Sequence, residues 1–274
     1  MIEALFDYKF LQYAFIASLL TSIICGIIGV IIIEKKLVMM SGGIAHTSYG
    51  GVGLGYLLGF EPILGAFAFS ILAAFGIGYI KRKGGTKTDV VIGLFWSLGM
   101  ALGILFIALT PGYPPDLSSY LFGNILSVLS SDIILISIVT LIVVFSILIF
   151  FNDWKSYLFD DEFAFIMGKK TAFMDYFLLV LVALTVVALI KVVGIILVIA
   201  LLTAPAASAA LLTNKFKNRI ILSIIFGIIF SFFGLWLSYE INIASGATIV
   251  ILSVLCYIIL FIIQSVNKKI KGKN

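Results

Sequence analysis

The chain has 274 residues, of which 62% are hydrophobic and only 11% are charged. A soluble domain carries roughly 25% charged residues, so this composition excludes an ordinary soluble protein. The net charge of +5 does not indicate nucleic-acid binding in such a chain, because the placement of its cations follows the rules of membrane topology. We therefore expect a membrane protein with lipid around it and no nucleic-acid partner.

Nine apolar stretches follow one another along the chain, and each is close to the length of about 20 residues that a helix needs to cross a bilayer. Charged residues lie only between the stretches or at their edges, since a charge at the bilayer centre costs at least ~2.5 kcal/mol. We predict an all-α polytopic transmembrane bundle of about nine spans, forming one domain over residues 1–274. The stretches are 10–33, 38–59, 62–80, 90–109, 133–151, 173–190, 192–213, 220–239 and 243–265.

Lysine and arginine gather in every second connection between the predicted spans. The positive-inside rule places such connections in the cytoplasm, so we expect the N-terminus outside and the C-terminus in the cytoplasm. Only Lys9 and Lys191 fall on the outer side. The cations of the cytoplasmic side are Lys35, Lys36, Lys81, Arg82, Lys83, Lys87, Lys155, Lys169, Lys170, Lys215, Lys217, Arg219, Lys268, Lys269, Lys271 and Lys273.

Two connections are long enough to have structure of their own. Residues 116–131 are too short and too polar to span, and we expect a re-entrant or surface helix on the outer side. Residues 152–171 form the longest cytoplasmic connection. Its acids Asp160, Asp161 and Glu162 precede lysines, an order that complements a helix dipole, and Gly168 is suited to end the helix.

His46 is the only histidine of the chain, and it lies inside the second apolar stretch. An ionisable group inside a membrane segment indicates function, and imidazole is a common ligand of transition metals. We therefore treat His46 as a candidate ligand of a transport pathway. The alternative is a histidine that only bonds to a neighbouring helix, and one imidazole cannot form a metal site alone.

Small residues mark two further stretches. Gly51, Gly55 and Gly59 repeat every four residues, a spacing that lets membrane helices approach closely. Pro205 lies inside an apolar stretch, where it removes one backbone hydrogen bond and predicts a kink. Both features serve helix packing or the lining of a pathway.

Carboxylate and amide oxygens occur in the outer connection before the last span. Glu240 and Asn242 lie there and are weaker candidates for cation contact. The alternative is a solvated acidic loop. We expect no disulfide, since both cysteines lie in apolar stretches.

Motifs of enzyme chemistry are missing from the sequence. There is no GxxxxGK[ST] phosphate loop, no HExxH, no CxxC and no GxSxG. The predicted spans also hold no pair of carboxylates for proton transfer. We predict that the chain is not an enzyme and that a partner supplies the energy for any transport.

Four stretches together resemble the membrane subunits of bacterial and archaeal ABC importers for zinc, manganese and iron. The glycine-rich second span with its histidine, LVMMSGGIAH followed by GVGL, is the first. LFGNIL in the outer connection is the second. VGIILV leading to LLTAPAA, and SGATIV at the start of the last span, complete the set. They lie at 37–54, 121–126, 193–207 and 245–250, so with the pattern of spans the resemblance covers nearly the whole chain.

The resemblance implies a permease with the fold of the type II ABC importers in the plasma membrane of a bacterium or archaeon. Two copies would pair, an ATPase subunit would bind at residues 152–171, and an extracytoplasmic binding protein would deliver a divalent metal ion. The ion is the substrate, and no permanently bound cofactor is implied. Many family members have aspartate where this chain has Gly42 and Asn242.

Two other functions stay open at this point. The missing acids favour a permease for a larger metal chelate or a vitamin, whereas the short chain favours an ion. A membrane scaffold without transport activity is the alternative from another class.

Overall fold

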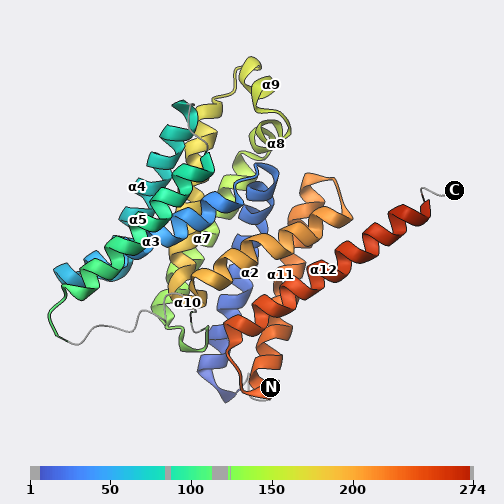
Figure 1. Cartoon of the computed structure of the whole chain (residues 1–274). Helices are drawn as coiled ribbons and strands as arrows, with labels where there is room; N and C mark the ends of the chain where they lie inside the picture. Colours follow the sequence, from blue (N-terminus) through green and yellow to red (C-terminus); the bar gives the residue numbers. More distant parts are fainter. Residues whose placement is uncertain (1–6, 84–87, 113–122, 124, 272–274) are drawn as a thin grey trace.

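The computed structural model describes residues 7–83, 88–112, 123 and 125–271, and within them the chain is helical without strands (Figure 1). The outward faces of several helices carry exposed leucine, isoleucine and phenylalanine, as a surface in contact with lipid requires. The elements are α2 (Lys9–Glu34), α3 (Val38–Leu58), α4 (Pro62–Lys83), α5 (Thr88–Ala108), η1 (Ile125–Ser127), α7 (Ser130–Ile149), α8 (Phe151–Phe159), α9 (Asp161–Ile166), α10 (Thr171–Leu212), α11 (Phe216–Ile241) and α12 (Ser245–Lys271).

Seven of the described helices are long and apolar enough to cross a membrane, which is fewer than the nine spans predicted. The difference comes from two helices. The glycine-rich α3 is not among the seven, and α10 counts once although it covers two predicted stretches. Half of the predicted outer helix at 116–131 lies outside the described residues, which include Gly123, η1 and the start of α7 there.

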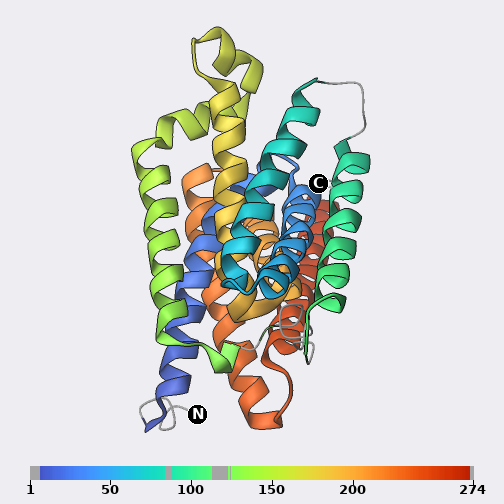
Figure 2. The ribbon, with the colours of Figure 1, turned by 90° about the vertical axis from the view of Figure 1, so that its left-hand side faces the viewer.

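α10 is the central helix, since it packs against α2, α3, α4, α7, α11 and α12. Figure 2 shows it between α7 and α5, which lie on opposite sides of the bundle. Its backbone is non-helical at Gly194, with φ 76° and ψ 161°, and beyond this break the helix turns back toward the start of α11 (Figure 1). Only glycine adopts such a positive φ at little cost.

The break in α10 lies at a different position from the one predicted. The predicted turn near Lys191 is wrong, because Lys191 is helical and pairs with the buried Asp132, with 3.0 Å between Nζ and Oδ1. Pro205 lies inside the helix beyond the break, and the described backbone keeps helical dihedral angles there. This half of α10 packs closely against α2, where a Cβ on Gly29 would lie 2.2 Å from the carbonyl oxygen of Leu202.

Glycines bring α3 and α4 into backbone contact. A Cβ on Gly51 would lie 2.0 Å from the carbonyl oxygen of Gly65, and a Cβ on Gly55 would lie 2.6 Å from the Cα of Pro62. Gly59 does not take part in this contact. It ends α3 with φ 73° and has no atom within 4 Å of its Cβ position, so it serves as a left-handed helix stop.

α3 is equally close to α5 on its other side. A Cβ on Gly53 would lie 2.6 Å from the carbonyl oxygen of Gly103. Thr47 of α3 donates its hydroxyl to the carbonyl oxygen of Phe95 at 3.0 Å. α3 is therefore packed closely between α4 and α5.

One end of the bundle gathers most of the charged residues. The C-terminal ends of α2, α4 and α7 meet there with α8, α9 and the starts of α10 and α11, and we call it the α9 end (Figure 1). The described cations at 35–36, 81–83, 155, 169–170 and 215–219 lie at this end. Asp132 and Lys191 pair near the opposite end.

Gly51→Ala is expected to destabilise the protein. The added methyl group meets the backbone of Gly65 at 2.0 Å. Such overpacking lowers the free energy of unfolding by about 1–3 kcal/mol, which exceeds the gain of about 1 kcal/mol from replacing glycine by alanine in a helix. Gly93→Ala is the matched control, since no atom lies within 4 Å of its Cβ position. The melting temperatures of the detergent-solubilised variants measure the effect, and equal values would contradict the packing argument.

Candidate functional site

His46 lies in α3 and stacks on Trp96 of α5, with 3.9 Å between ring centroids and 11° between the ring planes. Its Nδ1 atom is buried and has no hydrogen-bond partner among the described residues. One turn earlier, a Cβ on Gly42 would lie 3.4 Å from the same Trp96 ring. The imidazole is thus held by stacking, and the structure gives Nδ1 no bond to a neighbouring helix.

A partly buried imidazole without a fixed partner can offer a lone pair to a cation. The described residues contain no group of three His, Cys, Asp or Glu side chains that could hold a metal ion. One copy of the chain therefore supplies at most part of a coordination shell at His46.

Glu240 and Asn242 lie away from His46. α3 packs mainly against α4, α5 and α10, whereas α11, which these residues terminate, packs mainly against α2, α10 and α12. The Glu240 carboxylate accepts a hydrogen bond from Trp236 Nε1 at 3.3 Å. Asn242 ends α11 with φ 60° and lines a cavity of about 150 Å³. The structure does not bring the three predicted metal contacts together in one copy.

α8 and α9 form the connection that the sequence marked as a coupling segment. Asp160 caps α9 by accepting a hydrogen bond from the Phe163 amide at 3.0 Å, and Asp161 and Glu162 occupy the first turn. Gly168 follows with φ 78°, a backbone angle that favours glycine. The acids and the glycine therefore have the helix-bounding positions that their order predicted.

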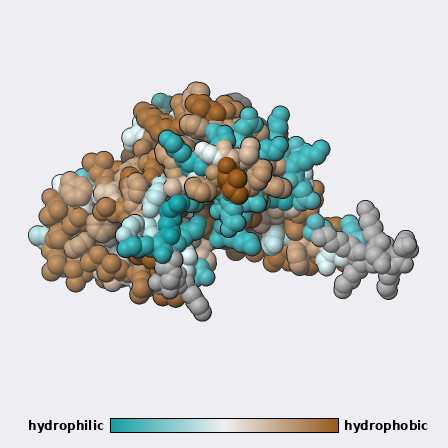
Figure 3. Space-filling model, turned by 90° about the horizontal axis from the view of Figure 1, so that it is seen from above, coloured by the Kyte–Doolittle hydropathy of each residue, from teal (hydrophilic) through white to brown (hydrophobic). Residues whose placement is uncertain are grey.

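Apolar side chains project from this segment. Phe159 is 90% exposed and Ile166 79% exposed, and Phe163, Phe165 and Met167 are also exposed. Seen from the α9 end, hydrophobic residues lie in the middle of a hydrophilic surround (Figure 3). An exposed apolar patch rimmed by polar residues marks an interaction site for protein or membrane. We call these five residues the α9 patch.

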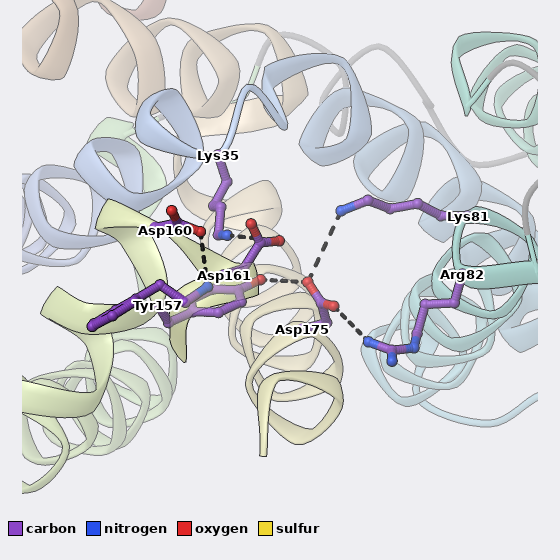
Figure 4. A network of polar contacts seen from close by, with 8 residues as sticks. Lys35, Lys81, Arg82, Tyr157, Asp160, Asp161 and Asp175 are labelled. Carbon is purple, nitrogen blue, oxygen red and sulfur yellow. Dashed lines mark hydrogen bonds and ion pairs between the residues drawn. The ribbon is translucent and has the colours of Figure 1, made fainter. Parts of the chain in front are cut away.

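Asp175, near the start of α10, connects this segment to the bundle (Figure 4). Its carboxylate accepts a hydrogen bond from the Tyr157 hydroxyl of α8 and lies 2.8 Å from Arg82 Nη1 of α4. Lys81 Nζ is 4.0 Å from the same carboxylate. Burial raises the pKa of Tyr157 well above its ordinary range, and the neighbouring carboxylate adds to the shift. The phenol therefore keeps the proton that it donates.

Lys35, just after α2, joins the same network. Its Nζ lies 3.4 Å from Asp161 Oδ2 and 3.6 Å from the centroid of the Tyr157 ring. Burial lowers the pKa of Lys35, and the Asp161 carboxylate opposes this shift. The network thus ties α9 to the ends of α2, α4 and α10.

Sequence reasoning selected Asp160, Asp161, Glu162 and Gly168, but it missed Asp175, Tyr157 and Lys35. The sequence did contain a signal for Asp175, which is an acidic residue near the start of the apolar stretch 173–190. An acid in such a place needs a partner, so its position indicates an ion pair or hydrogen bond. Its partners come from two other elements, α4 and α8, and could not be read from spacing.

Comparison with known proteins places this arrangement in a family. The model of the ABC 3 transport family matches residues 7–264. The chain belongs to this family. It is 39% identical over 261 residues to the manganese transport system membrane protein MntC of Listeria monocytogenes, covering 95% of this chain and 93% of that protein. It is 36% identical over 272 residues to the manganese import system permease protein ScaB of Streptococcus gordonii, covering 99% and 98%.

A solved structure agrees with this membership. PsaBC from Streptococcus pneumoniae in complex with Fab matches with a TM-score of 0.89 and 37% identity over 100% of this chain and 98% of that chain. The resemblance to metal-ion ABC importers inferred from the four stretches is confirmed, and the family member described here is a bacterial multi-pass plasma-membrane protein.

Asp175→Asn is expected to loosen α8, because the variant removes the charge that faces Lys81 and Arg82 and weakens the acceptor of Tyr157. Hydrogen–deuterium exchange of peptides covering 151–159 should rise about fivefold. Asp153→Asn is the control, because Asp153 forms only a surface pair with Lys169. A similar rise in both variants would show that the Asp175 network has no special role.

Proposed function

We propose that this chain is the permease subunit of an ABC importer that moves a divalent transition metal ion, manganese first among them, into the cytoplasm. The observation that carries the proposal is near full-length identity of 39% and 36% to two proteins named for manganese transport and import. The single intramembrane His46, with an unpartnered Nδ1, gives this family member a group suited to a passing cation.

The proposed topology has nine spans. The seven helices selected by length and hydropathy become nine when α3 is added and α10 is divided at Gly194. The α9 end, which carries most of the cations, would then face the cytoplasm, with the N-terminus outside. We propose for this topology the arrangement of the type II importers.

A homodimer fits the composition of the site. Each chain has one histidine, so a second imidazole has to come from another copy. Stacking on Trp96 fixes the plane of each ring, which leaves the ring nitrogens as the groups that meet the ion. An extracytoplasmic binding protein would deliver the ion at the end of the bundle that holds Glu240 and Asn242.

The energy would come from a cytoplasmic ATPase subunit bound at 152–171. The α9 patch offers that subunit an apolar surface, and the ion pairs of Asp161 and Asp175 connect the patch to α2, α4 and α10. A tilt of α9 would therefore be passed to the spanning helices.

His46→Ala is expected to lower manganese uptake by cells about tenfold or more, because the pathway loses its imidazole. Ser41→Ala is the matched control on α3, since the Ser41 hydroxyl donates only to the Val38 carbonyl of its own helix. Uptake of the radioactive ion is measured at equal amounts of protein in the membrane. Wild-type uptake by the His46 variant would remove this residue from the mechanism.

Phe165→Asp together with Ile166→Asp is expected to release the ATPase subunit, because the charges replace the apolar contact. The amount of ATPase that co-purifies with the tagged permease should fall about tenfold. Asn152→Ala, on the same connection but outside the α9 patch, should leave it unchanged. Full recovery of the ATPase with the double variant would show that it binds elsewhere.

A further inference from the structure

A groove of about 550 Å³ opens at the α9 end between α8 and the start of α11. It is separate from the His46 region and from the network of Asp175. Its volume lies in the range of about 300–1,000 Å³ that is usual for ligand sites. Its α8 wall belongs to the segment 152–171 proposed for the ATPase, but the function proposed above assigns the groove itself no ligand.

Arg219 holds one wall of the groove in place. Its Nε donates to the carbonyl oxygen of Thr213 at 2.7 Å, and its Nη2 donates to Asn214 Oδ1 at 3.1 Å. Its third contact is an ion pair with Glu34 at the end of α2. The guanidinium therefore shapes the loop before α11, and Glu34 balances its charge.

Three exposed lysines line the groove: Lys155 from α8, and Lys215 and Lys217 from the start of α11. None of them has an ion pair with a described residue, in contrast to Arg219. The groove therefore presents three uncompensated positive charges, and its guest has to be an anion.

The rest of the lining is apolar. The rings of Phe151 and Phe216 lie 5.7 Å apart, and Leu158 and Phe159 lie beside them. The helices that lead to the groove expose Ile149 and Leu212, at 69% and 53%. A ligand in the groove therefore meets lysines together with apolar side chains.

We propose that this groove binds the headgroup of an anionic phospholipid. The phosphodiester group pairs with the lysine ammonium groups, and the first carbons of the acyl chains pack on the phenylalanine and leucine side chains. Basic pockets between membrane helices commonly bind acidic lipid headgroups. An acidic protein segment would match the lysines, whereas acyl chains also match the apolar lining and the exposed Ile149 and Leu212 next to it.

The groove also shares Phe159 with the α9 patch. A lipid bound there lies next to the surface proposed for the ATPase. The lipid composition of the membrane would thereby influence how firmly the partner docks. Lipid binding itself does not depend on the ATPase, so the two proposals can fail separately.

The test is native mass spectrometry of the purified full-length chain titrated with phosphatidylglycerol, phosphatidylcholine or inorganic phosphate. The wild type should bind phosphatidylglycerol about tenfold more tightly than phosphatidylcholine, and inorganic phosphate should not displace it. Lys155→Gln, Lys215→Gln and Lys217→Gln combined should abolish this preference. The matched control, Lys36→Gln, Lys83→Gln and Lys170→Gln, removes the same charge at the same end and should keep it.

Three results would overturn the proposal. An equal loss in both triple variants would indicate general surface charge, and an unchanged preference in the groove variant would place the lipid elsewhere. Displacement by inorganic phosphate would indicate a site for a free anion. Lys217→Glu alone provides a second measurement that does not rest on the triple variant folding, and it should weaken phosphatidylglycerol binding while the gel-filtration profile stays that of the wild type.

Discussion

Backbone groups inside a bilayer have no water to bond with, so the chain must satisfy them within helices. The hydrophobic effect then contributes little to holding helices together, because lipid is as apolar as their surfaces. Close backbone contact takes its place, most clearly where Gly51 of α3 meets Gly65 of α4. There is no flexible side chain between the two helices at this point, so a displacement of one is passed to the other.

This contact links the two regions of interest. The C-terminal end of α4 carries Lys81 and Arg82, which pair with Asp175 beside α8 and α9. The same helix touches α3, and α3 carries His46 against Trp96 of α5. A continuous series of short contacts thus runs from the surface at the α9 end to the imidazole inside the bundle.

Much of this architecture was predictable because charge and glycine act locally. Lys35 and Lys81 mark helix ends since they cannot enter the bilayer, and Asp160 and Gly168 bound α9 through their own backbone bonds. The break at Gly194 was placed wrongly at Lys191, because a lysine near an apolar stretch looks like a loop when its partner Asp132 is unknown. The Asp175 network and the distance of Glu240 from His46 depend on helices far apart in the sequence, and no local pattern contains them.

The break at Gly194 also bears on how the protein is made. A straight helix of the 42 residues of α10 would be about 63 Å long at about 1.5 Å per residue, roughly twice the hydrocarbon thickness of about 30 Å. In the proposed nine-span topology, the insertion machinery therefore receives an apolar run that is too long for one crossing and has Lys191 as the charged residue near its middle. Its two halves would enter lipid as a hairpin, with the achiral Gly194 at the point where the nascent chain folds back.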